Sequence, residues 1–312
     1  MSYTVTRHDA ATALLAAAEP FLLQREAHNS LSLGEARAQQ RGTPAELAPR
    51  RRRSLYLTVS GPAGPALVAL SSAGRRLLLA DDGAANDAAL DVLVVALHAA
   101  PGVIPTLFAE EGLARRFVEQ WTRLTGQAAT LIERQHLLQL TAVTIPPDCP
   151  PGRLRPATVR ESELLGDWLM EFQGITRHHD AEDRHAAGVL VDGLLARKDL
   201  YVWDAGDNAT PRPVSMAARG RATARGVAVS LVYTPPEERG RGYATACVAH
   251  LSRLLLESDW QFCTLFVDEA NATTKTLYTR IGYHPIAVLA AYRFDPARRD
   301  QHPFLVDPQR AS

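Results

Sequence analysis

A short glycine- and arginine-rich run joins an expected strand to an expected helix in the C-terminal half of the chain. It reads LVYTPPEERGRGYATA from Leu231 to Ala246. Gly240 and Gly242 have no Cβ, so the backbone can approach a ligand closely there. The first N–H groups of the following helix have no intrahelical partners, and neighbouring arginines add positive charge. The run predicts a phosphate or pyrophosphate site. A plain strand–helix turn that uses glycine only for its geometry is the alternative.

A second motif follows one helix and one strand later, in NATTKTLYTRIGY from Asn271 to Tyr283. Asn271 is expected to cap a helix, and its side chain could also bond a ligand. Tyr278 lies near the end of that helix. A tyrosine in such a place is more often structural than catalytic. A neutral phenol with a pKa of about 10 can nevertheless donate a proton to a thiolate near neutral pH.

Together the two motifs resemble those of the GCN5-related N-acetyltransferase (GNAT) superfamily. The first matches P-x-x-R-G-x-G-x-A, with Pro236, Arg239, Gly240, Gly242 and Ala244. The second matches N-x-x-[AST]-x-x-L-Y-x-x-x-G-[FY], with Asn271, Thr274, Leu277, Tyr278, Gly282 and Tyr283. The resemblance covers about Leu154 to Phe294. Within the superfamily, this stretch is most similar to the bacterial branch of acetyltransferases with an FR47-like C-terminal region.

The resemblance implies acetyl transfer from acetyl-CoA to a primary amine, with a role for each matched position. Main-chain groups of the strand before the turn would pair with the pantetheine arm. Amides of the turn would hold the pyrophosphate. Asn271 would contact the cofactor, and Tyr278 would protonate the departing thiolate of CoA. The implied cofactor-binding residues are Val232, Tyr233, Thr234, Arg239, Gly240, Arg241, Gly242, Tyr243, Ala244 and Asn271. No metal is implied.

The sequence departs from the family pattern at two places. Glu237 stands where glutamine or arginine is usual, which matters little if backbone amides do most of the binding. The strand GVAVSLVYT before the turn carries no glutamate to deprotonate the acceptor amine; Ser230 is its only polar side chain in the middle. The base is left open between water, a residue of the loop between the first two helices, Asp268, Glu269 and an acceptor that arrives neutral.

Hydrophobic periodicity predicts the order β-α-α-β-β-β-α-β-α-β for the C-terminal half. The expected strands are 154–158, 200–204, 213–223, 226–234, 262–269 and 285–294. The expected helices are 160–172, 184–196, 243–257 and 271–281.

The N-terminal half shows almost the same order, without the first strand and without the glycine turn. Its expected helices are 10–19, 20–40, 87–99 and 113–125, and its strands are 54–60, 65–72, 75–81, 103–111 and 129–143. Its strand 103–111 reaches a helix with the single glycine Gly112. We therefore expect tandem α/β (α+β, mixed-sheet) domains, each a mostly antiparallel twisted sheet flanked by helices. In such a pair the N-terminal half would be a degenerate copy that shapes the acceptor cleft or supports the active half.

A proline-rich segment marks the expected boundary between these domains. IPPDCPPGRLRP, from Ile145 to Pro156, cannot form the interior of a helix or of a central strand. The expected domains are residues 1–148, the degenerate copy, and 153–312, the catalytic domain.

Composition limits the partners. The 34 basic and 34 acidic residues cancel, so no bulk attraction to nucleic acid or to an anionic membrane is expected. The three cysteines lack paired or metal-ligand spacing, which fits a reducing cytoplasm. Lysine is nearly absent, which suggests a GC-rich bacterial genome. A membrane span is not expected either, because Val92 to Ala109 is broken by prolines and glycine.

Two polar segments could add function. His178 to His185 lies in the expected loop that borders the acceptor site in the family; acceptor binding is favoured there over a metal site, with a solvated loop as the alternative. Arg50 to Arg53 is most simply a solvated loop.

The main alternative to an N-acetyltransferase is a CoA-binding sensor or partner-binding module without turnover. Transfer of another acyl group, including aminoacyl transfer, is a further alternative. The absent glutamate keeps the sensor possible, and Tyr278 argues against it. Neither the acceptor nor the oligomeric state follows from the residues, although a small-molecule or peptide amine fits the family.

Overall fold

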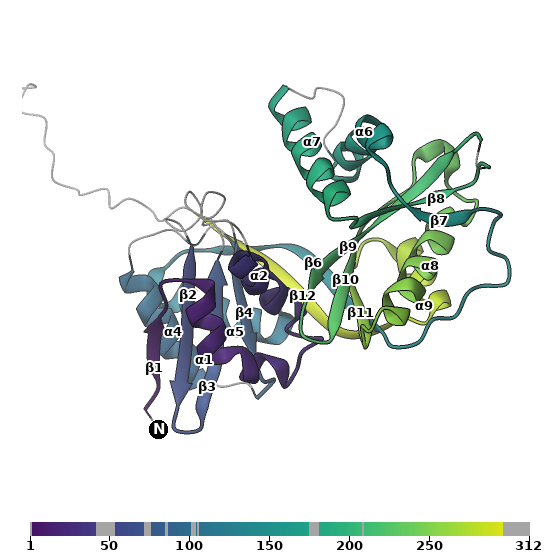
Figure 1. Ribbon diagram of the computed structural model, residues 1–312. Coiled ribbons are helices and arrows are strands. Elements are labelled where there is room, and N and C mark those ends of the chain that lie inside the picture. Colours follow the sequence, from purple (N-terminus) through teal and green to yellow (C-terminus); the bar gives the residue numbers. More distant parts are fainter. Residues whose placement is uncertain are drawn as a thin grey trace, which may run out of the picture.

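The structure is a computed structural model, and it describes residues 2–41, 54–71, 76–84, 87–100, 104, 106–174, 181–207 and 209–295. These residues form one continuous twelve-stranded sheet with helices on both faces (Figure 1). The strand order is β1-β2-β3-β4-β5-β12-β6-β11-β10-β9-β8-β7. The expected tandem, mostly antiparallel α/β architecture is confirmed, but the two halves share a single sheet.

The strands are β1 (Thr4–Arg7), β2 (Leu55–Gly61), β3 (Gly64–Ser71), β4 (Leu77–Asp81), β5 (Thr106–Glu110), β6 (Ala129–Leu140), β7 (Arg153–Pro156), β8 (Leu200–Asp204), β9 (Pro213–Ala222), β10 (Gly226–Tyr233), β11 (Phe262–Asp268) and β12 (His284–Phe294). The helices are α1 (Ala11–Leu23), α2 (Ser30–Arg41), α4 (Asp87–Ala99), α5 (Glu111–Thr125), α6 (Ser162–Phe172), α7 (Ala181–Ala196), α8 (Tyr243–Glu257) and α9 (Ala272–Ile281). Two 3₁₀ turns, Val159–Glu161 and Pro236–Glu238, precede α6 and α8.

The element order repeats. Both halves follow β-α-α-β-β-β-α-β-α-β, from β1 to β6 and from β7 to β12. In each half the fourth and fifth strands are parallel, as β4–β5 and β10–β11, whereas the other neighbouring strands of the described sheet are antiparallel. The expected repeat is therefore confirmed, and β1 completes it. The sequence analysis missed β1 because it is a four-residue, mostly exposed edge strand.

The last strands of the two halves are exchanged. β6, from the N-terminal half, lies between β11 and β12, while β12 lies between β6 and β5 (Figure 1). His136 on β6 is opposite Val267 on one side and opposite Val288 on the other. Each half thus contributes one central strand to the packing of the other.

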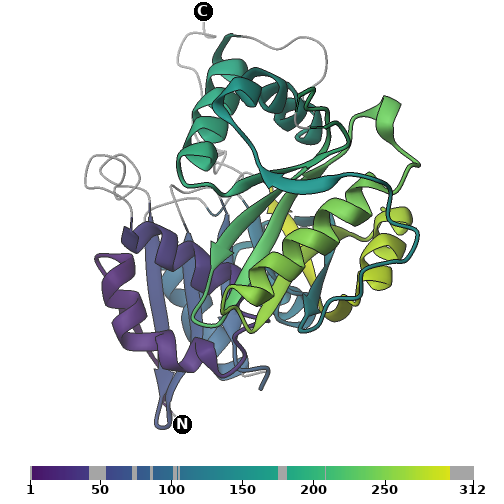
Figure 2. The same ribbon diagram turned by 45° about the vertical axis from the view of Figure 1, so that its right-hand side comes forward.

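Four hydrophobic clusters fix the helices on the two faces of the sheet. In the C-terminal half, α8 and α9 cover one face, and α6 and α7 cover the other (Figure 2). In the N-terminal half, α4 and α5 lie opposite α1 and α2. Successive side chains of β12 point to opposite faces of the sheet. Ala290 packs towards α4 and α5, whereas Leu289 and Ala291 pack towards α1 and α2.

The expected helix break at Pro20 is wrong. Pro20 lies inside α1, which continues to Leu23, and the chain turns at residues 24–29 before α2 begins at Ser30. A proline removes one helical hydrogen bond. Leu14, Ala18 and Leu22 are fully buried along the same helix. Burial on both sides of the proline outweighs the lost bond and keeps α1 continuous.

A buried carboxylate joins the two halves where the turn after α1 meets the β9–β10 hairpin. Glu26 accepts hydrogen bonds from Thr223 Oγ1 at 2.6 Å, from the Arg225 backbone N–H at 2.6 Å and from Arg225 Nε at 2.7 Å. Burial would raise the pKa of Glu26, but these hydrogen bonds outweigh it and lower the pKa below its ordinary value. The ionised carboxylate therefore stabilises the folded chain.

We expect Glu26→Ala to lower the free energy of unfolding by about 3 kcal/mol, because the Arg225 backbone N–H and the buried Thr223 hydroxyl each lose their 2.6 Å hydrogen bond and the Arg225 guanidinium loses its ion-pair partner. Glu257→Ala, which removes an exposed carboxylate 4.0 Å from Arg253, should cost under about 1 kcal/mol. Urea unfolding measures both. Since folding lowers the pKa of Glu26, the difference should be present at neutral pH and shrink as the pH falls through that lowered pKa. Equal effects of the two substitutions at pH 7 would contradict this role.

Candidate active site

The glycine turn forms an open helix N-terminus. Gly240 and Gly242 have φ of 76° and 80°, a left-handed region that favours glycine. Gly242 is the N-cap of α8, and no side chain caps this end. The first turn of α8 also contains no acidic residue. The free N–H groups and the positive end of the helix dipole therefore favour an anion here.

Three arginines surround the turn and hold its shape. Arg239 Nε donates to the carbonyl of Thr234 at 3.0 Å, and Arg241 donates to Glu238 at 3.0 Å. Arg212 donates to the same carboxylate at 2.6 Å. Glu238 is thus shared by two guanidinium groups. The arginines orient the loop, and their combined charge exceeds that of the single carboxylate.

A cavity of about 980 Å³ runs from this turn to Tyr278. Its walls are the end of β10, the start of α8 and one face of α9. The lining residues are Val232, Tyr233, Thr234, Glu238, Arg239, Gly240, Gly242, Tyr243, Ala244, Thr245, Asn271, Thr276, Leu277, Tyr278 and Arg280. The expected site residues lie together on this cavity except Arg241, whose exposed side chain instead pairs with Glu238.

Four further residues line the cavity that no sequence signal had singled out: Thr245, Thr276, Arg280 and Glu238. Leu277 of the second motif lines it as well. On α9, Arg280 lies four residues after Thr276 and three after Leu277, so it is a helix-surface neighbour of each of them. Arg280 also donates to Asp148 of the linker at 2.6 Å. The helical spacing from Leu277 was a usable signal for Arg280. No sequence pattern indicates that Thr245 and Glu238 line the cavity; their position follows only from the fold.

The strand before the turn separates from its neighbour and bulges. β10 pairs with β11 only from Gly226 to Ala228. Beyond that point two residues, Leu231 and Val232, lie opposite one residue of β9, because Ser230 pairs with Ala218 and Tyr233 with Met216. Leu231 has φ of 51°, a conformation that costs roughly 1–2 kcal/mol for a residue with a side chain. Beyond Ala228 β10 and β11 are unpaired, which leaves a slot between them, and the bulge re-aims the side chains of β10 that follow it.

Tyr278 is a buried phenol at the inner wall of the cavity. Its side chain is 4% exposed, and its ring meets that of Tyr283 edge to face at 5.8 Å between centres. Burial, together with the neighbouring Cys247, raises the pKa of Tyr278 well above its ordinary value. Among the described residues no group hydrogen-bonds its hydroxyl. The phenol therefore stays protonated at neutral pH and can donate to a bound molecule.

Asn271 directly precedes α9, as expected for a cap position. Its backbone N–H donates to the carbonyl of Asp268 at 2.9 Å, and its exposed side chain lines the cavity. The neighbouring acids that were considered as bases are both engaged. Asp268 accepts from the backbone N–H of Ala270 at 2.9 Å, and Glu269 lies 3.8 Å from both Arg134 and His136.

The corresponding place in the N-terminal half is closed. It lies where β4 and β5 separate, and the turn that matches the glycine turn is the one after β4, not the one at Gly112. In that turn the carboxylates of Asp81 and Asp82 accept from the backbone N–H groups of Gly83 and Ala84, each at 2.9 Å. The amides that could bind a phosphate are thus occupied, and the local charge is negative.

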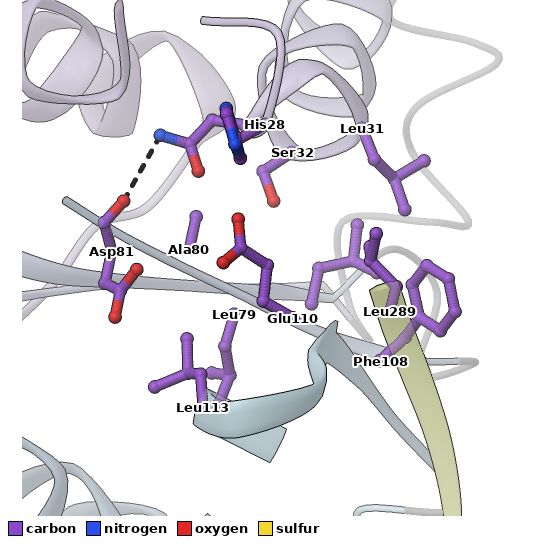
Figure 3. A pocket seen from close by; sticks show the side chains of 12 residues that line it. His28, Leu31, Ser32, Leu79, Ala80, Asp81, Phe108, Glu110, Leu113 and Leu289 are labelled. Atoms are coloured by element: carbon purple, nitrogen blue, oxygen red, sulfur yellow. Dashed lines mark hydrogen bonds between the residues drawn. The ribbon is translucent and has the colours of Figure 1, made fainter. Parts of the chain in front are cut away.

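Side chains fill the rest of this N-terminal cleft. Arg25 donates to Asp81 at 3.3 Å and to Glu110 at 2.9 Å. His28, Asp81 and Glu110 surround a remaining cavity of about 20 Å³ (Figure 3), enough for about one water molecule. Burial raises the pKa of Asp81 and lowers that of His28. A CoA molecule cannot enter this space.

A family model matches part of the cavity-bearing half. Residues 211–293 match the family model described as FR47-like protein. This segment contains the bulge, the glycine turn, α8, β11, α9 and most of β12. Solved structures cover the rest of the chain. An acetyltransferase from the GNAT family of Colwellia psychrerythraea has a TM-score of 0.59 at 8% identity, over 94% of this chain and all of the other.

The chain has the GNAT fold, with an FR47-like C-terminal region. A GCN5-related N-acetyltransferase from Sphaerobacter thermophilus has a TM-score of 0.52 at 15% identity, over 93% of this chain and 95% of the other. A tandem GNAT protein from the clavulanic acid biosynthesis pathway has a TM-score of 0.53 at 10% identity, over 95% and 99%. The tandem GNAT arrangement is therefore shown. A comparison with curated proteins gave no significant match.

The remaining features that the sequence suggested add little to this site. Arg50 to Arg53 and His178 to Asp180 lie outside the described residues. Within the described part of the chain, no cluster of three or more histidine, cysteine or acidic side chains could hold a metal ion. None of the helices described there has the length and apolar character needed to cross a membrane.

Proposed function

We propose that this protein transfers an acetyl group from acetyl-CoA to a primary amine, and that it does so at the C-terminal cavity. The proposal rests on one observation: the uncapped N-terminus of α8 and Tyr278 line the same cavity. An anion site at one end and a neutral phenol at the other suit a long ligand with phosphates at one end and a thioester at the other. The FR47-like match and the GNAT fold support the same activity.

The residues fit such a ligand. The backbone from Arg239 to Ala244 would hold the pyrophosphate, because its amides and glycines face the cavity uncapped. The main chain from Val232 to Thr234 would pair with the pantetheine arm. This strand end is fixed, since Ser215 Oγ donates to the carbonyl of Tyr233 at 3.0 Å and Thr234 Oγ1 donates to Ser215 Oγ at 2.9 Å. Bound acetyl-CoA supplies the activated acyl carbon.

The reaction proposed is direct attack. The amine nitrogen forms a bond to the thioester carbon and gives up one proton to water, and the C–S bond breaks. Tyr278 gives its proton to the departing sulfur and recovers one from solvent. Backbone N–H groups near the bulge polarise the carbonyl, in an oxyanion-hole role. Holding both reactants in this slot is expected to supply most of the rate increase.

The test is amine-dependent release of the CoA thiol. Purified protein is mixed with acetyl-CoA and with simple primary amines, and free thiol and acetylated amine are measured together. Equal amounts of both products would support N-acetyl transfer. Binding of acetyl-CoA without turnover of any amine would instead favour a CoA-binding sensor, for which the absence of a carboxylate on β10 is the supporting feature. Turnover only with another acyl-CoA would replace the acetyl group in the proposal.

A further inference from the structure

A tyrosine–glutamate pair lies where the cavity meets the opposite face of the sheet. Tyr233 is the last residue of β10 and lines the cavity. Its hydroxyl donates to Oε2 of Glu171, which lies in the last turn of α6. A carboxylate thus reaches the end of β10 from a different element, although the strand itself carries none.

The bulge in β10 produces this placement. Val232 packs with the core below α8 and α9, on the face of the glycine turn. After the bulge, Tyr233 packs with Trp168 and the core below α6 and α7, with ring centres 6.1 Å apart. Val232 and Tyr233 are consecutive, and their side chains therefore lie on opposite faces of the sheet beside the slot. The pair lies on the side away from α8, where an acceptor can approach without crossing the proposed cofactor path.

The surroundings of Glu171 favour a positive charge. Glu171 is exposed and lies at the C-terminal end of a helix, where the helix dipole is negative. Among the described residues no arginine, lysine or histidine forms an ion pair with it. Arg239 also lies beside Tyr233, with Cζ 5.8 Å from the ring centre, but its Nε is bonded to the Thr234 carbonyl. The carboxylate is thus left able to bind a cation.

Tyr233 is the hydrogen-bond donor of the pair. Burial and the hydrogen bond to Glu171 raise the pKa of Tyr233 to about 12. The protonated phenol therefore orients the carboxylate of Glu171. Such a carboxylate stabilises a nearby ammonium ion and raises its pKa, so it disfavours the neutral amine that attack requires. The pair therefore suits a positive group of the acceptor that does not react.

We propose that Glu171, oriented by Tyr233, binds a second amino group of the acceptor in its protonated ammonium form, so that the preferred acceptors are diamines. This rests on the proposed N-acetyl transfer. One amine would enter the slot between β10 and β11 as the nucleophile, and the other would stay protonated at Glu171. The pair determines specificity and takes no part in proton transfer to the thiolate.

The test compares three probes of equal chain length: 1,4-diaminobutane, 4-amino-1-butanol and 4-aminobutanoate. A charged hydrogen bond lost on going from diamine to amino alcohol should lower kcat/KM about 10- to 100-fold in the wild type. The amino acid, with a repelled carboxylate, should be poorer still. Glu171→Gln should bring the ratio between diamine and amino alcohol close to one, and Tyr233→Phe should reduce it partly.

Glu163→Gln is the matched control. Glu163 lies on the same helix two turns earlier and is also exposed, so it changes the same net charge without touching Tyr233. It should keep the wild-type ratio, and calorimetry with CoA should give unchanged affinity for Glu171→Gln. A wild-type ratio near one, a ratio retained in Glu171→Gln, or equal loss in both variants would overturn the diamine proposal alone. Failure to acetylate either amine would overturn the proposed function together with it.

Discussion

Replacing Tyr278 by phenylalanine should lower kcat for amine acetylation by about 10²- to 10⁴-fold, the usual contribution of a positioned general acid. The affinity for acetyl-CoA should hardly change, because the ring stays in its buried place against Tyr283. Only the hydroxyl, which no described residue hydrogen-bonds, is lost. Steady-state kinetics with a saturating amine measure kcat, and calorimetry measures the binding of acetyl-CoA.

Tyr292→Phe is the control for this experiment. Tyr292 lies on β12 and packs against the cluster under α4 and α5, away from the cavity. It should leave kcat within about twofold. A Tyr278→Phe variant with wild-type kcat would remove the proton-donor role, and loss of acetyl-CoA binding in that variant would show that the hydroxyl holds the ligand instead.

Cutting the chain at the proline-rich linker should have the largest effect on folding. Residues 153–312 alone lack β6, the strand that pairs with both β11 and β12. Without it β11 becomes an open edge, and β12 loses both neighbours, which exposes backbone groups and apolar surface. We expect this half to be insoluble alone. Expressed together with residues 1–148, which supply β6 and β5, it should become soluble, copurify with them and bind acetyl-CoA.

The fragment experiment also bears on the proposed domain limits, 1–148 and 153–312. These limits follow the order of the chain, whereas three neighbouring strand pairs of the sheet, β5–β12, β12–β6 and β6–β11, join the two halves. A soluble, acetyl-CoA-binding fragment of residues 153–312 alone, with the circular dichroism of a folded protein, would contradict the expected dependence on β6. It would mean that the C-terminal half closes its sheet without the exchanged strand.

Local signals were enough to predict most elements of this fold. Helix α8 begins and ends where the sequence indicates, because Gly242 adopts a left-handed cap and apolar residues recur at helical spacing up to Glu257. The strand Leu200–Asp204 and the helix Asp87–Ala99 are likewise found at the expected residues. In these segments the apolar periodicity and the turn residues indicate the same element boundaries, and tertiary contacts do not shift them.

Long-range pairing and local strain were not predictable. No residue near His136 indicates that it lies between Val267 and Val288, since pairing partners far apart in sequence leave no local pattern. The bulge depends on a left-handed Leu231, which a leucine rarely adopts. For the same reason Glu171 was missed as a neighbour of Tyr233. The turn whose amides bond Asp81 and Asp82 could be matched to the glycine turn only once the structure showed that β4 and β5 are the parallel pair.

The central claim is that one chain has one acetyl-CoA site, at the glycine turn of the C-terminal half. Calorimetric titration of the intact protein with acetyl-CoA tests it most directly, beside a Gly240→Glu, Gly242→Glu double variant of unchanged circular dichroism. Both glycines have positive φ, so glutamate would strain the turn and place two carboxylates at the anion site. We expect one site per chain in the wild type and none in the variant. Two sites per chain, no binding by the wild type, or undiminished binding by the variant would contradict it.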